Sequence, residues 1–138
     1  MNRLYIEPTG ISPEIDFSPA DNRFIIRGNS APEDVRALYY PVIEWLGIFV
    51  SDVIEGEYRY SHDSPLLFQI NLHYFNSSSA KYLFDIFMEL KKLSDKNIPL
   101  LVEWHYDPDD SDQKDAGEDI ALLAGMEFRY IEIKPDQQ

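Results

Sequence analysis

Residues 66–75, Leu-Leu-Phe-Gln-Ile-Asn-Leu-His-Tyr-Phe, constrain the fold more than any other segment of the chain. They are rich in strand-forming residues and contain neither Gly nor Pro, which predicts a β-strand. Large side chains are expected on both faces, with Phe68, Ile70, Leu72 and Tyr74 on one and Leu67 and Phe75 on the other. Such a pattern is typical of an internal strand covered by helices. Asn71 and His73 make the second face the less apolar one.

The segments on either side of this strand predict helices. Residues 35–53 carry apolar side chains at helical spacing, and Ser30-Ala31-Pro32-Glu33 before them combines a capping box with a helix-opening proline. Pro41 lies inside the pattern, so we expect a kink or a restart near Tyr40. A second helix is expected from residue 78 or 79 to about residue 93.

The remaining elements are shorter. A capping pair, Asp110 and Gln113, predicts a third helix that runs to about residue 123 and stops near Gly125. Further strands are expected at residues 4–6, 14–17, 23–27, 100–106 and 128–133, the second and third of these forming a hairpin. The order β-β-β-α-β-α-β-α-β predicts an α/β fold with one mixed sheet, since strands joined through helices run parallel.

Length and composition narrow the class of protein. The 138 residues, 44% of them hydrophobic, predict a single domain over residues 1–138 with a packed core and a flexible tail at 134–138. The absence of cysteine excludes disulfides and thiolate chemistry. A net charge of −13 argues against binding to nucleic acid or to anionic membranes. We find no signal peptide, and the apolar stretches fall short of the roughly 20 residues of a membrane helix, so a cytoplasmic protein is expected.

A polar cluster, Asn76-Ser77-Ser78-Ser79, lies between the strand at 66–75 and the second helix. Its hydroxyls lie among free backbone N–H donors at the positive end of a helix dipole, where a phosphoryl group can be held. The same residue types also serve simply as helix caps. The acidic turn 107–112 follows the next strand, so both segments are expected at the same edge of the sheet.

Other chemical candidates are weaker. The three histidines lack metal-ligand spacing, the acidic turn lacks the glycine and glutamate of an EF-hand, and no nucleophile–base pair accompanies the serines. We therefore expect no enzyme activity, no metal and no cofactor. An alternative remains open, a small-ligand or metal site on one sheet face formed by Asn71, His73, Glu103 and His105.

Several motifs, in this order and spacing, resemble the SiaC family of bacterial regulatory phosphoproteins. The resemblance spans nearly the whole chain. Its motifs are Thr9-x-x-Ser12-Pro13-Glu14-Ile15, Arg27-Gly28-x-Ser30-x-Pro32-Glu33, Ile43-Glu44-Trp45, Asn76-Ser77-Ser78-Ser79, Trp104-His105-Tyr106-Asp107, Asp109-Asp110-x-Asp112 and Ala116-Gly117-Glu118-Asp119.

The resemblance implies a STAS-like fold and a role in partner switching and cyclic di-GMP signalling. A dedicated protein kinase phosphorylates one hydroxyl residue, a PP2C-type phosphatase reverses this, and the unphosphorylated form binds and activates a diguanylate cyclase or similar signalling partner. In the best-known member the modified residue is the threonine of an Asn-Thr-Ser-Ser motif, which matches Ser77, with Ser78 as second choice. The expected partner-binding rim around this position consists of Asn76, Ser78, Ser79, Asp107, Asp109 and Asp110.

Overall fold

One mixed β-sheet forms the base of the molecule. The computed structural model describes residues 1–134, and their strands lie in the order β1-β2-β3-β4-β5-β6. The first three strands are antiparallel neighbours, whereas β3, β4, β5 and β6 run parallel. The mixed sheet and its element order are those predicted, with β4 inside the sheet. The strands are β1 Leu4–Ile6, β2 Glu14–Ser18, β3 Arg23–Ser30, β4 Leu66–Phe75, β5 Leu100–Tyr106 and β6 Arg129–Glu132.

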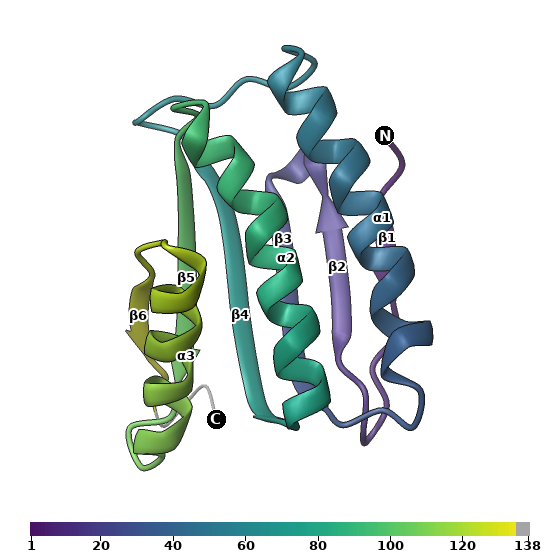
Figure 1. The fold of residues 1–138 in the computed structure, drawn as a ribbon, viewed down its shortest axis with the longest axis vertical. Coiled ribbons are helices and arrows are strands. Elements are labelled where there is room, and N and C mark those ends of the chain that lie inside the picture. Colours follow the sequence, from purple (N-terminus) through teal and green to yellow (C-terminus); the bar gives the residue numbers. More distant parts are fainter. Residues whose placement is uncertain (135–138) are drawn as a thin grey trace.

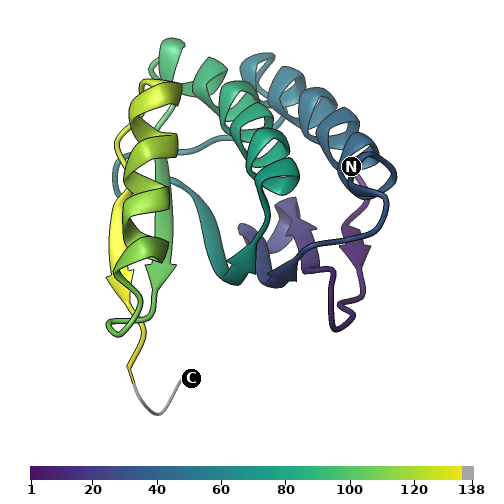
Figure 2. The same ribbon diagram turned by 60° about the horizontal axis from the view of Figure 1, so that its bottom comes forward.

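The helices form a single layer on one face of the sheet (Figure 2). They are α1 Val35–Ile54, α2 Ser77–Asp95 and α3 Ser111–Ala124, which connect β3 to β4, β4 to β5 and β5 to β6. A short 3-10 helix, η1 Pro19–Asp21, lies within the predicted hairpin. Figure 1 looks onto the helix layer, in which α2 lies between α1 and α3. The predicted tail at 134–138 falls almost entirely outside the described residues.

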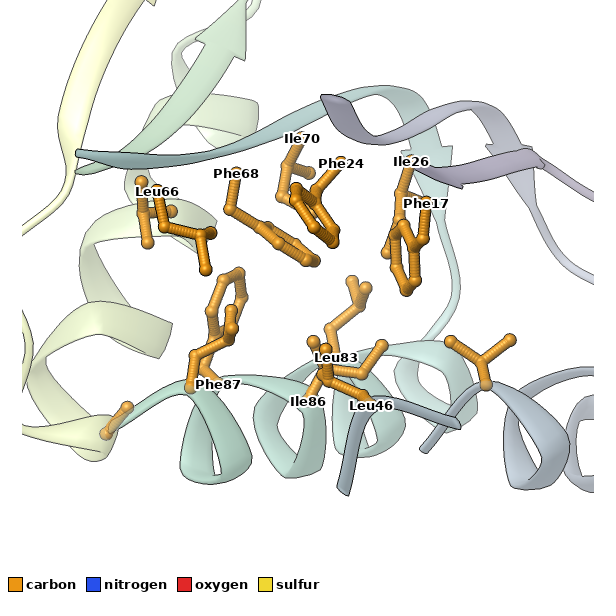
Figure 3. Close-up of a cluster of buried hydrophobic side chains, with 14 of the residues drawn as sticks. Phe17, Phe24, Ile26, Leu46, Leu66, Phe68, Ile70, Leu83, Ile86 and Phe87 are labelled. Atoms are coloured by element: carbon orange, nitrogen blue, oxygen red, sulfur yellow. The ribbon is translucent and has the colours of Figure 1, made fainter. Parts of the chain in front are cut away.

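Aromatic and aliphatic side chains fill the space between the sheet and the helices (Figure 3). Phe17, Phe24 and Phe68 reach down from the sheet, and their rings lie within 6.3 Å of one another. Leu46 and Phe87 meet them from the helices, and all five side chains have no exposed surface. Burial of apolar surface at about 25 cal/mol per Å² makes this one layer of contact the main stabilising force.

The alternation along β4 changes at His73. Leu72 pairs with Gly28 and Tyr74 with Asn29, so His73 is an extra residue, a β-bulge. The bulge reverses the side-chain alternation beyond it. Tyr74 is therefore 58% exposed, and Phe75 points to the helix face, where its ring lies 5.9 Å from that of Trp104. The predicted faces of Tyr74 and Phe75 were wrong for this reason.

The second face of the sheet is not covered by any helix of residues 1–134, so the predicted burial of β4 on both faces was wrong (Figure 2). Leu67, Gln69 and Asn71 on this face are only partly buried. Ion pairs cross it instead, including Arg3 Nε to Asp16 Oδ1 at 2.7 Å and Arg27 Nε to Glu14 Oε1 at 2.6 Å. A charged sheet face of this kind is stable in water without a second helix layer.

Helix α1 differs from its prediction at its start. Asp34, and not Ser30, is its N-cap, because Ser30 is the last residue of β3 and uses its hydroxyl elsewhere. The helix continues through Pro41, so the predicted restart near Tyr40 does not occur. Its 20 residues also reach the length and apolarity of a membrane span, contrary to the expectation for this chain. Six of its side chains, however, are buried against the sheet and α2 as in a core helix.

Two glycines in helix interiors provide a paired test of the packing. A Cβ at Gly117 would lie 2.6 Å from the ring of Trp104, whereas one at Gly47 would have only a side-chain oxygen of Glu89, at 3.8 Å, near it. We expect Gly117→Ala to lower the free energy of unfolding by about 1–3 kcal/mol through overpacking. Gly47→Ala should raise it by up to about 1 kcal/mol through helix propensity. Urea unfolding measures both, and a stabilised Gly117→Ala would contradict this packing.

Candidate functional site at the edge formed by the ends of β4 and β5

Asn76 caps α2 and fixes the start of the helix against β3. Its side-chain Oδ1 accepts a hydrogen bond from the Ser79 backbone N–H at 2.9 Å. Its own backbone N–H donates to the Ser30 carbonyl at 3.0 Å. The helix therefore begins at Ser77, one or two residues before the predicted start at residue 78 or 79, and the first turn contains no acidic residue. The positive end of the helix dipole is thus free of a neighbouring carboxylate within that turn.

The three serines of the cluster have different environments. Ser77 and Ser78, the first two residues of α2, are exposed, and their hydroxyls make no hydrogen bond to another residue within 1–134. Ser79 has no exposed surface. Its inclusion in the expected partner-binding rim was therefore wrong, because the third residue of the helix turns inward onto the end of β3.

A chain of buried hydroxyls holds Ser79. Its Oγ donates to the Ser30 carbonyl at 2.9 Å and accepts from the Ser30 hydroxyl at 2.8 Å. The Ser30 Oγ also lies 2.6 Å from the Tyr39 hydroxyl. Because the single proton of Ser30 goes to Ser79, Tyr39 is the donor in this last bond. Burial raises the pKa of Tyr39 to about 12, which keeps that proton in place at neutral pH.

Gln113 joins the last part of β4 to the turn that follows β5. Strands β4 and β5 are paired only as far as Ile70 and Trp104, although both continue beyond this point. The Gln113 side chain occupies the gap: its Nε2 donates to the Leu72 carbonyl, and its Oε1 accepts from the Asp107 N–H at 2.6 Å. Gln113 is 7% exposed, so these bonds are shielded from water.

A cavity of about 350 Å³ lies between the end of β4 and the start of α3. Tyr74 and Phe75 line one side, directly before Asn76, and Asp110 and Asp112 line the other. The end of β4 and the acidic turn thus border a common hollow. The serine cluster follows β4 directly in the chain, and the parallel pairing of β4 with β5 places the loops after these strands at the same edge of the sheet. Asp107 and Asp110 also have structural roles, since they accept hydrogen bonds from the N–H groups of Asp109 and Gln113. Asp109 itself is exposed.

The alternative set of polar residues is only partly brought together. Glu103 accepts a hydrogen bond from Gln69 at 3.0 Å and lies 3.5 Å from His105 on the uncovered sheet face. Asn71 is on the same face, and its side-chain oxygen is buried without a hydrogen-bond partner among residues 1–134. His73 is the bulge residue and lines the cavity beside α3 instead. Within residues 1–134, no three His, Cys, Asp or Glu side chains are grouped so that they could hold a metal ion.

Sequence reasoning missed Ser30, Tyr39 and Tyr74 as parts of this edge. In the sequence, Ser30 has the pattern of a helix cap and Tyr39 that of a core residue. Nothing in the sequence around them shows that the Ser30 hydroxyl bonds to Ser79, 49 residues away, and to Tyr39. Tyr74 was assigned to the core by strict alternation, which the bulge at His73 breaks. The capping pattern of Asp110 and Gln113 in the sequence did indicate a role for Gln113 at the start of α3. The hydrogen bond from the Gln113 side chain to β4 could not be predicted from that pattern.

The fold and this edge define a class: a mixed α/β sheet with helices on one face, and an exposed pair of serines opening a capped helix beside a hollow. The family model for "SiaC family regulatory phosphoprotein" matches residues 6–133. The chain therefore belongs to the SiaC family of regulatory phosphoproteins. An uncharacterized protein of Pseudomonas aeruginosa strain UCBPP-PA14 is 32% identical over 107 residues, which are 78% of each chain.

Solved structures from the same family share the whole fold. Apo-SiaC from Pseudomonas aeruginosa superposes with a TM-score of 0.79 and 27% identity, covering 95% of this chain and 99% of that one. A second structure, the diguanylate cyclase SiaD in complex with its activator SiaC from the same organism, matches with a TM-score of 0.80 and 26% identity. It covers 94% of this chain and 99% of the matched chain.

The unequal environments of adjacent serines predict unequal effects of substitution. Ser79→Ala removes the acceptor of the buried Ser30 hydroxyl and should lower the free energy of unfolding by about 1–3 kcal/mol. Ser78→Ala, a change of the same chemistry at an exposed position, should alter it by less than about 0.5 kcal/mol. Thermal and urea unfolding of both variants test this. Equal effects of the two substitutions would mean that the buried hydroxyl chain does not fix the start of α2.

Proposed function

We propose that this chain is a non-enzymatic regulator whose binding to a signalling partner is controlled by phosphorylation of Ser77. A protein kinase adds the phosphate and a PP2C-type phosphatase removes it. The unphosphorylated form binds and activates a diguanylate cyclase or a similar signalling protein, and residues 1–138 act as one regulatory domain. No nucleic acid, membrane, metal or cofactor takes part in this function.

The observation that carries the proposal is the free hydroxyl of Ser77 at the first position of α2. It is exposed and makes no hydrogen bond within residues 1–134, so a kinase can reach it without opening the domain. The cap is supplied by Asn76, and the inward anchor by Ser79. Modification of Ser77 therefore leaves both of these contacts in place, and the helix N-terminus stabilises the added negative charge.

Ser77 is preferred over Ser78 because it is the position that matches the modified threonine of the family motif. Helix geometry supports phosphorylation at either residue. Residues three and four apart are neighbours on a helix, so the exposed Lys81 can pair with a phosphate on Ser77 or on Ser78.

A phosphate on Ser77 would disturb a partner that binds this edge. It adds a charge of about −1.5 to −2 and the bulk of a phosphoryl group. Any partner that covers Ser77 must then remove water from that charge or move away from it. Asp109 and Asp112 belong to the loop and helix start that follow β5 at the same edge of the sheet, so a partner that also covers these carboxylates meets more negative charge there. A penalty of about 3 kcal/mol would lower the affinity more than a hundredfold.

The partner class rests on the family relation. The similar structure that contains a second protein pairs SiaC with the diguanylate cyclase SiaD, for which it is the activator. The hollow at the end of β4, whose lining reaches Phe75 two residues before Ser77 and includes the exposed Tyr74, is a surface on which a protein partner can dock. Its lining of aromatic and acidic side chains suits a partner that offers an apolar side chain next to a basic one.

A comparison of four forms tests the switch: unmodified protein, Ser77→Ala, Ser77→Asp and enzymatically phosphorylated protein. We expect Ser77→Ala to bind a purified diguanylate cyclase of the same operon or cell as tightly as the unmodified protein, because the hydroxyl is neither cap nor anchor. Phosphorylated protein should bind about a hundredfold more weakly. Ser77→Asp should lie between them, since it carries less charge and bulk. Isothermal titration calorimetry gives all four affinities.

Ser78→Asp is the matched control, because it adds the same charge one residue away on a different side of the helix. It should weaken binding less than Ser77→Asp does. Thermal melts verify that every form is folded. Equal affinity of phosphorylated and unmodified protein, with both folded, would contradict the switch.

A further inference from the structure

Helix α1 is apolar on two sides. Its inner side is buried against the sheet and α2, through Tyr39, Val42, Leu46, Phe49, Val50 and Val53. Between Arg36 and Asp52, Glu44 is its only charged residue. Yet only 33% of its most apolar stretch is buried in the fold. A helix that is apolar all round is normally covered on all sides, so the outer side of α1 lacks a cover within residues 1–134.

Exposed apolar side chains lie on the uncovered side of α1, with Glu44 between Tyr40 and Ile48. Tyr40, Ile48 and Ile54 are 51%, 58% and 40% exposed, and Met88 on α2 is 40% exposed. A groove of about 720 Å³ runs between the two helices on this side. Both helices belong to the layer in front of the sheet in Figure 1. Tyr40 and Ile48, which line the groove, are exposed, so the groove is open to solvent. Clustered exposed apolar side chains mark a protein contact surface more often than scattered ones do.

Gly47 keeps the groove open. It lies in the interior of α1 and lines the groove together with Glu89 of α2. Glycine in a helix interior costs about 1 kcal/mol relative to alanine. The backbone at Gly47 has no positive φ, and a Cβ would meet the nearest atom only at 3.8 Å, so neither conformation nor space within the fold requires glycine here. The missing side chain serves a close approach from outside.

The charges along the groove are mostly negative. Its lining, including its continuation past Gly47, carries the carboxylates of Glu44, Asp52, Glu55 and Glu89 and one ammonium group, that of Lys92. Lys92 is already paired with Glu89, with both oxygens at 3.0 Å. Arg36 lies at the Tyr40 end, with its guanidinium 5.5 Å from that ring. An occupant must therefore offer apolar side chains flanked by cations.

We propose that the groove between α1 and α2 is a docking site for an amphipathic helix of a partner protein, with an apolar stripe bordered by lysine or arginine. The apolar stripe of the partner helix covers Tyr40, Ile43 and Ile48, and the partner backbone approaches at Gly47. A second copy of this chain fits poorly, because it would bring the same carboxylates against one another. Glu89 lies about 18 Å along α2 from Ser77, whereas the other end of the groove, at Tyr40, lies next to Tyr39 of the buried hydroxyl chain. The site is therefore distinct from Ser77 itself, and its centre at Gly47 lies further along α1.

The probe is a synthetic peptide of about 18 residues with leucines at helical spacing and lysines elsewhere. A scrambled peptide of identical composition, without an apolar face, is its control. Fluorescence anisotropy near physiological salt, where weak non-specific charge attraction is screened, should show the amphipathic peptide binding about tenfold more tightly than the scrambled one. Amide shift changes in NMR should be confined to residues 36–55 and 85–92.

Two pairs of variants of the full chain complete the test. Gly47→Leu fills the groove without changing any charge and should weaken peptide binding about tenfold, whereas Gly47→Ala should weaken it less. Ile48→Asp should also weaken it, while Leu122→Asp, the same change at an 81% exposed site on α3, should leave it unchanged. Ser77→Asp should bind the peptide as tightly as the unmodified protein does. Peptide binding therefore tests the groove independently of the proposed switch at Ser77.

Several results would overturn the proposal. Equal binding of the scrambled peptide, or unchanged binding by folded Gly47→Leu, would show that charge alone attracts the peptide. Self-association of the unmodified protein that Ile48→Asp abolishes in sedimentation would assign the groove to a second copy. Binding to phosphatidylglycerol vesicles that Ile48→Asp abolishes would assign it to a lipid surface.

Discussion

The direction in which the chain adds strands to the sheet controls the rest of the structure. From β3 to β6 each parallel strand is placed beside the previous one in the same direction, and each is reached through a helix. Crossovers of one hand then place α1, α2 and α3 on the same face (Figure 2). The hydrophobic core therefore lies on one face of the sheet, and the other face, which no helix of residues 1–134 covers, carries polar and charged side chains. The loops after β4 and β5 also meet at one edge, where the candidate site lies.

At that edge, the buried Ser79 and the exposed Ser77 have different roles. Ser79 and Ser30 share hydrogen bonds that tie the first turn of α2 to the end of β3, and Tyr39 closes the buried chain. Ser77 is held at a fixed place by these contacts without taking part in them. A hydroxyl that is fixed in position but free in its bonding can be modified without unfolding the domain. This is the physical basis of the proposed switch.

Much of this could be predicted from the sequence because the patterns are local. The strand–helix order, the hairpin, the Asp110 cap and the stop at Gly125 follow from periodicity and turn chemistry. The errors arose where a distant contact overrode a local pattern. Ser30 has the pattern of a helix cap, but the structure keeps it in β3, where Ser79 and Tyr39 use its hydroxyl. One extra residue, His73, reversed the faces of Tyr74 and Phe75. Neither the bonding of Ser30 nor the bulge at His73 can be predicted from the neighbouring sequence.

The proposed switch depends on Ser77 as the residue that carries the phosphate in the cell. Mass spectrometry of the protein purified from its native host, with fragmentation that locates the modification, is the decisive measurement. We expect a phosphorylated fraction of the protein with the phosphate on Ser77, and loss of that fraction when the chain carries Ser77→Ala. A phosphate on another residue, or its persistence in Ser77→Ala, would contradict the proposed switch.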